Sequence, residues 1–432
     1  MTGARSESET IVNDQHDGDD PRVGEPRDDA SPPPDAPSSD GPPPDAPPPN
    51  ASQPDGSAAD GSDDGTSFFD DQAADEEERR PGFFGRHKAL TVLGALAIVL
   101  VLAVAAGAVY VNHVLFGDID KIDAFGSIDE SARPQPTNGE AINILLAGAD
   151  NGDSEGLTIQ QAMADGTWSA GQYRSDTIMV LHIPADHSQA YVVSIPRDSY
   201  VPIYDETGKA TGKHKVNYAF SVYGPSGYVS TIEHLTDVRM DHLAIVDWDG
   251  FKDVVDTLGG VRIYVPQTVH DSQQNFTYEQ GWHDYNGEHA LKYVRSRYAL
   301  DEGDFDRNRR QQNFLRAMLD QMASMGALTD FPTFLSAAKT ITSNLTIDDT
   351  WSNGDMRSLG WSMRGIRKDD VTFLSAPINK RHPFGEVPGD GSVVHLSKRG
   401  MNDLFGAMRA DDMQTYVNDH PELTLPSDTQ VQ

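Results

Sequence analysis

Apolar and polar positions alternate in short blocks over most of this chain, but one stretch is apolar throughout. Residues 89–111 (ALTVLGALAIVLVLAVAAGAVYV) are 23 consecutive positions without a charge. At about 1.5 Å of rise per residue, a helix of this length crosses the roughly 30 Å hydrocarbon core of a bilayer. Residues 86–88 (RHK) precede the run, whereas Asp118 and Asp120 follow it. This charge asymmetry predicts a single-pass helix with residues 1–88 in the cytoplasm and all later residues outside the cell membrane.

A cleaved signal peptide is the alternative interpretation of the same run, because residues 106–108 (AGA) are small enough for a cleavage site. The apolar core of a signal peptide usually has about 7–15 residues and follows a short basic start. This run is longer and follows 88 residues, so the pattern favours a retained anchor.

Beyond the anchor, short runs rich in β-branched residues predict buried strands. They cover residues 141–148, 177–183, 190–195, 242–246, 261–265 and 371–374. Apolar residues at helical spacing predict helices over 251–258 and 308–325. Strands separated by helices predict an α/β fold of the α-β-α type, with a central mixed β-sheet covered by helices.

The predicted fold forms one domain, because no linker-like segment interrupts residues 140–415. Residues 112–139 contain Pro134 and Pro136 in a polar stretch and predict a linker between the anchor and this domain. Residues 416–432 predict a flexible C-terminus.

Composition changes the interpretation of the first 88 residues. They hold 14 of the 27 prolines and have a net charge of −15, from 7 basic and 22 acidic residues. Low hydrophobicity with high net charge cannot offset the entropy lost on folding, so this tail is predicted to be disordered. It is a solubilising spacer or an arm that binds proline-recognition modules.

The whole chain carries 34 Lys and Arg against 67 Asp and Glu, a formal charge of −33, and has no cysteine. The absence of cysteine excludes disulfides, thiolate metal sites and a catalytic thiol. The negative excess argues against binding to nucleic acid, which requires a basic face for phosphates.

Charged residues stand where three predicted strands begin or end. The first strand runs into Asp150, the second follows Arg174 and Asp176, and the third ends at Arg197 and Asp198. Ligands of α/β proteins bind where strands end. Asp150 and Asp176 would supply the hard oxygen ligands that Mg²⁺ prefers. The alternative is that each is an aspartate of a turn or cap.

Two arginine-rich segments form a second candidate site. Arg295 and Arg297 are two positions apart, so an extended segment would point both the same way. Arg307, Arg310 and Gln311 share one helical face with apolar residues. Arginines in a first helical turn oppose the helix dipole, and their presence predicts a bound anion such as phosphate. The alternative is a set of ion pairs with neighbouring carboxylates, namely Asp301, Glu302, Asp304 and Asp306.

These motifs together resemble the LytR–CpsA–Psr family, whose members attach anionic glycopolymers, such as teichoic acid or capsule, to peptidoglycan. The motif core lies in residues 140–325. The matching segments are residues 143–150 (NILLAGAD), 174–179 (RSDTIM), 194–198 (SIPRD), 215–217 (KVN), 293–297 (YVRSR), 304–307 (DFDR) and 310–311 (RQ).

The resemblance implies a phosphotransferase that acts on a polyprenyl-diphosphate-linked glycan and a peptidoglycan acceptor at the membrane. It implies Mg²⁺ or Mn²⁺ on Asp150 and Asp176, and a lipid chain in an apolar tunnel. Asp198 or Asp304 would be the general base. The implied ligands of the diphosphate are Arg174, Arg197, Lys215, Arg295, Arg297, Arg307, Arg310 and Gln311. Of these, Arg295, Arg297 and Arg307 would also stabilise charge during the reaction.

Two other functions remain as alternatives. The family also carries an older label of transcriptional attenuator, which would make the chain a non-catalytic regulator; an acidic domain outside the membrane is poorly placed to contact DNA. A pyrophosphohydrolase would use the same residues with water as the acceptor.

Overall fold

The computed structural model describes residues 100–101, 110–117, 119–137, 139–150, 159–297, 300, 302–325 and 331–432. The tail predicted for 1–88 and most of the anchor predicted for 89–111 lie outside these residues. Within the described part of the chain, no helix combines the length and the apolar character needed to span a bilayer.

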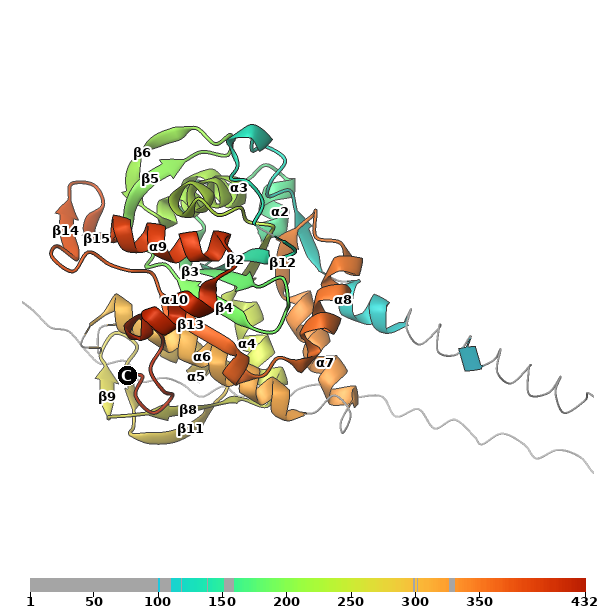
Figure 1. Ribbon diagram of the computed structural model, residues 1–432. Coiled ribbons are helices and arrows are strands. Elements are labelled where there is room, and N and C mark those ends of the chain that lie inside the picture. Colours follow the sequence, from blue (N-terminus) through green and yellow to red (C-terminus); the bar gives the residue numbers. More distant parts are fainter. Residues whose placement is uncertain are drawn as a thin grey trace, which may run out of the picture. The chain divides into compact units, whose positions relative to one another are not determined.

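The centre of the fold is a mixed sheet in which the described residues form seven strands, in the order β1-β12-β7-β2-β3-β4-β13 (Figure 1). The pairs β1/β12, β7/β2 and β4/β13 are parallel, and the other neighbours are antiparallel. The strands are β1 (Asp120–Ile122), β12 (Leu345–Asp348), β7 (His242–Asp247), β2 (Ile142–Asp150), β3 (Arg174–Ile183), β4 (Ala190–Ser194) and β13 (Val371–Ser375). The predicted central mixed sheet is confirmed.

One face of the sheet is covered by α3 (Asn217–Thr236), α9 (Lys398–Arg409) and α10 (Met413–Asp419). Alternate residues of β2 point to this face, and Leu145 and Ala147 pack with Phe220 of α3 and Phe405 of α9 in one buried cluster. Side chains alternate between the two faces of a strand and return to the same face of a helix about every 3.6 residues. Each element can therefore turn one row of apolar side chains toward the other.

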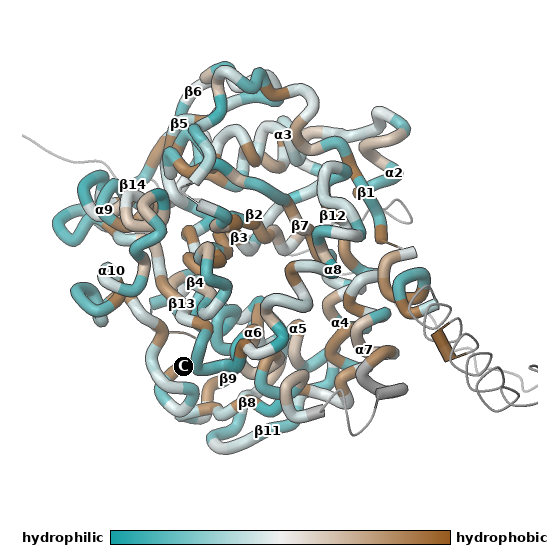
Figure 2. The backbone as a smooth tube through the Cα atoms, turned by 45° about the vertical axis from the view of Figure 1, so that its right-hand side comes forward, coloured by the Kyte–Doolittle hydropathy of each residue, from teal (hydrophilic) through white to brown (hydrophobic). Residues whose placement is uncertain are grey.

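The other face is covered by α4 (Trp248–Thr257), α5 (Gly287–Arg295), α6 (Asp304–Met325) and α7 (Phe331–Ser343). These helices pack mainly among themselves, around Val255, Tyr293 and Phe314. Contact with the sheet runs through a smaller set of partly buried residues, such as Leu146 and Leu315. The result is a seam between two apolar surfaces. Figure 2 shows hydrophobic residues along β2 and β3.

The remaining elements are two short helices, several hairpins and 3₁₀ turns; the short helices also pack against the core, one through Ile159 and Ala162 and the other through Met356 and Leu359. They are α2 (Ile159–Ala164), β5 (Tyr200–Tyr204), β6 (Ala210–Lys215), β8 (Val261–Val265), β9 (Val269–Asp271), β10 (Phe276–Tyr278), β11 (Gly281–Tyr285), α8 (Asn353–Ser362), β14 (Phe384–Val387), β15 (Gly391–Val394) and the 3₁₀ turns η2 (Glu130–Ala132), η3 (Met363–Gly365), η4 (Lys368–Asp370) and η5 (Pro421–Leu423). The strand predicted at 261–265 exists as β8, but it pairs with β11 and stays outside the central sheet.

Two segments that the sequence placed outside the domain belong to it. Within the predicted linker 112–139, β1 pairs with β12, and Ile122 and Phe125 are buried in the core. At the predicted flexible end 416–432, the backbone N–H of Leu425 donates to the Phe373 carbonyl at 2.9 Å. Both predictions are therefore wrong over these residues, because a few apolar side chains in a polar stretch suffice to anchor it when the rest of the core supplies their partners.

Candidate active site

Antiparallel pairing of β3 with β4 brings two of the predicted strand-end motifs together. The two strands meet at the start of β3 and the end of β4, where the Ile195 N–H donates to the Ile178 carbonyl at 2.9 Å. Beyond that point the Arg197 guanidinium binds the Asp176 carboxylate through a short hydrogen bond. The sequence predicted that these motifs would meet at one edge of the sheet, and the structure places them there.

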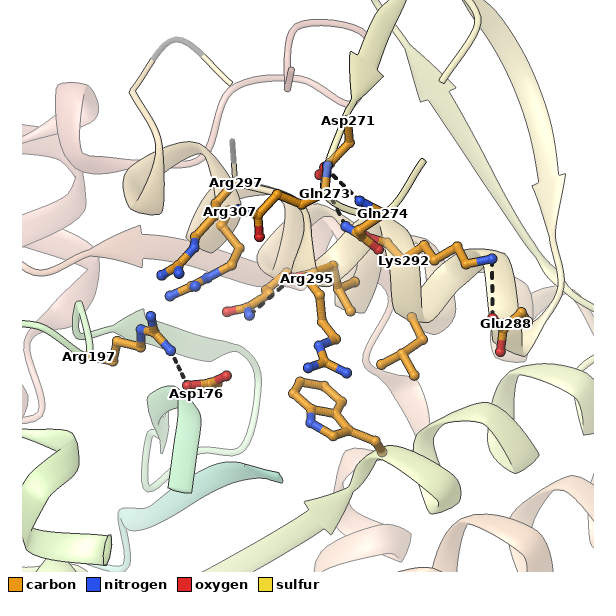
Figure 3. A pocket seen from close by; sticks show the side chains of 14 residues that line it. Asp176, Arg197, Asp271, Gln273, Gln274, Glu288, Lys292, Arg295, Arg297 and Arg307 are labelled. Carbon is orange, nitrogen blue, oxygen red and sulfur yellow. Dashed lines mark hydrogen bonds and ion pairs between the residues drawn. The ribbon is translucent and has the colours of Figure 1, made fainter. Parts of the chain in front are cut away.

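The first turn of α6 adds a carboxylate on which three arginines from different segments converge. Oδ1 of Asp304 lies 3.3 Å from Nη1 of Arg307 and 3.9 Å from Nη1 of Arg297. Its Oδ2 lies 3.8 Å from Nε of Arg197. Figure 3 shows Arg297 and Arg307 extending from one wall of the pocket toward Arg197 and Asp176 on the other.

The sequence predicted an extended segment for Arg295 and Arg297. In the structure Arg295 instead ends helix α5, and Arg297 follows two residues later. Asn286 caps this helix by accepting from the His289 N–H, and Arg295 is its last residue. Ser296 is buried and its hydroxyl donates to Asp271 at 2.6 Å, which fixes the turn between the two arginines. The period-two interpretation missed the helical spacing of buried residues on this helix, Ala290, Tyr293 and Val294.

Asp176 and the four arginines Arg197, Arg295, Arg297 and Arg307 line a cavity of about 470 Å³. Five positive and three negative side chains face it, so the cavity as a whole favours an anion. Its lining consists of Asp176, Arg197, Trp248, Asp271, Gln273, Gln274, Glu288, Leu291, Lys292, Val294, Arg295, Arg297, Arg307 and Gln311. We name it the cationic cavity.

Arg307 lacks hydrogen-bond acceptors for part of its guanidinium. Its side chain is 5% exposed. Burial lowers the pKa of Arg307, because removal from water disfavours the charged guanidinium. Its Nε and Nη2 are buried without a hydrogen-bond partner. Buried donors of a charged group are normally satisfied, so this arrangement indicates a site for phosphate-like oxygens.

Asp198 and Asp304 form a carboxyl pair with opposite pKa shifts. Burial by itself would raise the pKa of Asp198, but a hydrogen bond with Asp304 and the charges of Arg197 and Lys215 lower it to about 2. Nζ of Lys215 lies 3.0 Å from Oδ1 of Asp198. Burial and the Asp198 carboxyl raise the pKa of Asp304. The two groups therefore differ in basicity, with Asp304 the stronger base.

Not every predicted site residue faces the cationic cavity. Arg310 is fully buried on another side of α6, where its guanidinium lies between the rings of Tyr278 and Tyr293 at 4.9 and 4.6 Å from their centroids. The prediction that Arg310 binds the diphosphate is therefore wrong, because aromatic faces hold this guanidinium away from the cavity. Arg174 starts β3 as an exposed residue and does not line the cavity. Gln311 does line it, and its amide also donates to the Val294 carbonyl at 3.3 Å.

The predicted metal ligands lie at the same end of the sheet. Asp150 is the last residue of β2 and pairs in register with Arg174, although its side chain lies outside the described part of the structure. Asp176 faces the cationic cavity. No group of three or more histidine, aspartate or glutamate side chains that could hold a metal ion occurs among the described residues.

The ion pairs of the alternative interpretation are present: Asp304 pairs with Arg297 and Arg307, and Glu302 and Asp306 pair with Arg309. Arg309 lies 2.6 Å from Glu302 and 2.7 Å from Asp306. These two carboxylates thus serve Arg309 on the outer side of α6. Arg307 has Asp304 alone as an ion-pair partner within 4 Å among the described residues.

An apolar cavity of about 260 Å³ adjoins the cationic cavity in the seam between the sheet and helices α4 to α7. Trp248, Val294 and Gln311 line both cavities, which places the two side by side. The other lining residues are Leu146, Ala147, Gly148, Thr177, Met179, Ala244, Val246, Phe251, Val254, Phe314, Leu315, Met318, Ile341 and Leu345. The sequence predicted an apolar tunnel only through its family resemblance.

The sequence analysis did not identify several residues of the cationic cavity. Trp248 follows β7, which runs parallel to β2, so the strand-end rule applied to Asp150 could have found it. The Trp248 ring lies 5.4 Å from the Arg295 guanidinium, a cation–π contact. Asp271, Gln273 and Lys292 come from the β9–β10 hairpin and α5, and no local pattern marked them.

The fold and the cavities define an α/β protein in which a cationic pocket adjoins an apolar one. The chain belongs to the LytR_cpsA_psr family, whose model matches residues 118–405. This match begins at β1, in agreement with the corrected start of the domain.

Two relatives and one solved structure are similar to this chain. It is 32% identical over 324 residues to the probable cell wall biosynthesis protein LcpB of Corynebacterium glutamicum, covering 74% of this chain and 70% of that protein. It is 29% identical over 284 residues to the polyisoprenyl-teichoic acid–peptidoglycan teichoic acid transferase TagU of Bacillus subtilis, covering 65% and 83%. The crystal structure of B. subtilis TagV shares the fold with a TM-score of 0.51 at 24% identity, covering 64% of this chain and 98% of that one.

Proposed function

We propose that this chain is a phosphotransferase that moves an anionic glycopolymer from a polyprenyl-diphosphate carrier onto peptidoglycan during cell-wall assembly. The unsatisfied buried guanidinium of Arg307, in a cationic cavity that adjoins an apolar one, carries the proposal. The relative TagU, named for transfer of teichoic acid to peptidoglycan, supports this choice of donor and acceptor.

The two joined cavities match the two chemically different parts of such a donor. The diphosphate lies among Arg197, Arg295, Arg297 and Arg307, whose planar forks hold phosphate oxygens bidentately. The polyprenyl chain lies in the apolar cavity, where its burial favours binding in proportion to the area removed from water. Residues common to both cavities mark where lipid and phosphate join.

The reaction is a displacement at phosphorus. An acceptor hydroxyl oxygen forms a bond to the glycan-side phosphorus, and the bond from that phosphorus to the bridging oxygen breaks. Polyprenyl phosphate leaves with the bridging oxygen, and the glycan is joined to the acceptor by a phosphodiester. The arginines stabilise negative charge on the phosphoryl oxygens, which is the main requirement of phosphoryl transfer. No nucleotide is consumed, since the diphosphate bond supplies the free energy.

Asp304 is the general base that takes the hydroxyl proton. Its raised pKa makes it a better proton acceptor than an ordinary aspartate, whereas Asp198, with a pKa of about 2, is a weak base. Asp198 instead holds Arg197 and Lys215 in place and raises the basicity of its neighbour.

Asp150 and Asp176 are the residues that would hold Mg²⁺ or Mn²⁺. Two carboxylates beside a diphosphate are the donor set that Mg²⁺ accepts, and Asp176 faces the cationic cavity while Asp150 ends the adjacent strand. When bound, the ion would neutralise charge on the diphosphate.

The direct test combines the purified exterior domain with a polyprenyl-diphosphate glycan, a peptidoglycan acceptor and Mg²⁺. We expect a glycan–peptidoglycan phosphodiester and one polyprenyl phosphate for each bond formed. Arg307→Met should lower the rate about 10²–10³-fold, whereas Arg399→Met, at a 93% exposed side chain on α9, should not change it.

Two outcomes would contradict the proposal. Release of free phosphorylated glycan in the presence of acceptor would identify a pyrophosphohydrolase. No reaction and no donor binding by the folded protein would leave a non-catalytic regulator as the better description.

A further inference from the structure

A third cavity, of about 510 Å³, lies next to the reaction centre on the side away from the apolar cavity. Two of its residues adjoin catalytic ones in sequence, since Pro196 precedes Arg197 and Phe305 follows Asp304. The lining is completed by Glu302, Asn308, Arg309, Ser375, Ala376, Pro377, Ile378, Lys380, Pro383, Phe384, Glu422, Leu423, Thr424, Leu425 and Pro426. We name it the outer groove.

Helix α6 separates the outer groove from the cationic cavity by presenting a different face to each. Arg307 and Gln311, four positions apart, face the cationic cavity. Phe305 and Arg309, also four apart, face the outer groove. With about 3.6 residues per turn, Asp304 falls between these two faces. Asp304 itself lines neither space, but its carboxylate lies within 4 Å of Arg297 and Arg307 of the cationic cavity, and the next residue, Phe305, lines the groove.

The β14–β15 hairpin, which forms the outer wall of the groove, is attached directly to the reaction centre. The Val394 N–H donates to the Asp198 carbonyl at 2.8 Å. Phe384 lies opposite Val394 in the hairpin register and is 59% exposed. Its ring lies 5.6 Å from that of Phe305, centroid to centroid. An exposed aromatic face is therefore held in a set position relative to Asp198 and Asp304.

The geometry of phosphoryl transfer requires an acceptor site on this side. The attacking and leaving oxygens lie roughly in line through phosphorus, so the acceptor approaches opposite the departing polyprenyl phosphate. In the proposed function the polyprenyl phosphate leaves toward the apolar cavity, which takes the lipid chain. The far end of the cationic cavity, with Gln273, Gln274 and Glu288, offers hydrogen bonds to the donor glycan. The outer groove is then the remaining approach to Asp304.

We propose that the outer groove binds the glycan strand of the peptidoglycan acceptor and presents its hydroxyl to Asp304. This inference rests on the proposed function and adds a substrate-binding surface to it. The exposed face of Phe384 suits the C–H face of a pyranose ring, and charges of both signs on the rim, Glu302, Arg309 and Lys380, suit glycan hydroxyls and the charged groups of a peptide stem.

The test is steady-state kinetics of the full chain with donor and acceptor varied separately. Phe384→Ala should raise the KM for the acceptor about tenfold, while the KM for the donor and the free energy of unfolding stay unchanged, because the ring is mostly exposed. Trp361→Ala, at a 69% exposed aromatic on α8, is the matched control and should change neither KM.

Binding of soluble peptidoglycan oligosaccharides, followed by NMR line broadening, supplies a readout that needs no turnover. Wild type and Trp361→Ala should bind alike, and Phe384→Ala about tenfold more weakly. Trp282, 47% exposed beside a different polar groove, provides the competing site. If Trp282→Ala raises the acceptor KM and Phe384→Ala does not, the outer groove is not the acceptor site.

The outcomes separate this inference from the proposed function. Wild type that transfers glycan while Phe384→Ala keeps a normal acceptor KM overturns the inference alone. A rise in the donor KM in Phe384→Ala assigns the groove to the donor glycan and also overturns it. Failure of wild type to bind donor overturns the proposed function.

Discussion

At the scale of single residues, the position of an arginine in the fold, and not its residue type, decides whether its role is functional or structural. Arg307 and Arg310 are three positions apart on α6, and both are buried. Each guanidinium keeps two buried nitrogens without a hydrogen-bond partner. Arg310 lies between two tyrosine rings and donates to the Gln432 carbonyl at 2.6 Å, whereas Arg307 lines the cationic cavity. The sequence identified both as arginines on a helix and could not distinguish them, because the distinction depends on hairpins far along the chain.

The buried charge of Arg307 should cost stability while it supports activity. We expect Arg307→Met to leave the free energy of unfolding unchanged or raise it by about 1 kcal/mol, because an incompletely compensated buried charge is removed. Asp304 keeps contacts with Arg197 and Arg297 in this variant. Urea denaturation measures the effect, alongside the transfer rate described above. A loss of more than about 2 kcal/mol would instead mark Arg307 as a structural residue.

The carboxyl pair predicts the direction of a pH effect. Asp304 must be ionised to accept a proton, so activity falls as the pH drops through its pKa. That pKa is raised by burial and by the Asp198 carboxyl. In Asp198→Asn the second cause is removed, the pKa of Asp304 falls, and the acid limb of the kcat/KM profile moves to lower pH.

The position of the acid limb is the relevant readout for this variant, since its height also reflects the altered setting of Arg197 and Lys215. Asp403→Asn, at a 54% exposed side chain on α9, is the control and should keep the wild-type profile. An acid limb that stays in place or moves to higher pH would remove Asp304 from the role of base.

At the scale of elements, α6 organises the site because different faces of this helix border four different regions of the protein. One face lines the cationic cavity, one the outer groove, one the aromatic cluster around Arg310, and the later turns the apolar cavity. The sequence predicted the helix and its apolar stripe from spacing. It assumed an extended segment at Arg295 and Arg297, whereas Arg295 is the last residue of α5, in which the buried residues Ala290, Tyr293 and Val294 follow helical spacing.

The apolar turns of α6 offer a test of the lipid site. Met318 lines the apolar cavity, and Met318→Trp should fill part of it. We expect the KM for a long-chain polyprenyl donor to rise about tenfold or more and that for a short-chain donor to change less.

Met322→Trp, one turn later on the same helix, is the matched control. Met322 packs in the helical core and does not line the apolar cavity. Overpacking should cost each variant about 1–3 kcal/mol of stability. Equal effects of the two substitutions on both donors would show that the cavity does not hold lipid.

At the scale of the whole molecule, the sheet and its two covers form layers, and the site lies where the seam between two layers reaches the ends of strands (Figure 1). The cellular position of this domain stays a prediction from residues 86–111. A reporter enzyme that folds only outside the cytoplasm should be active when fused after residue 432 and inactive when fused at residue 80. The reverse result would place the domain in the cytoplasm and contradict the proposed function, whose substrates belong to the cell envelope.

The sequence by itself determined the strands that begin at Ile142, Arg174 and Ala190, the charged residues beside them, and membership in a family of cell-envelope proteins. Local periodicity and short motifs suffice for these, because they depend on neighbours in the chain. The tertiary structure alone decided that Arg307 faces a cavity and Arg310 does not, that residues 120–122 join the sheet, and that Asp304 is more basic than Asp198. Those properties depend on burial and on charges brought together from distant segments, which no local pattern contains.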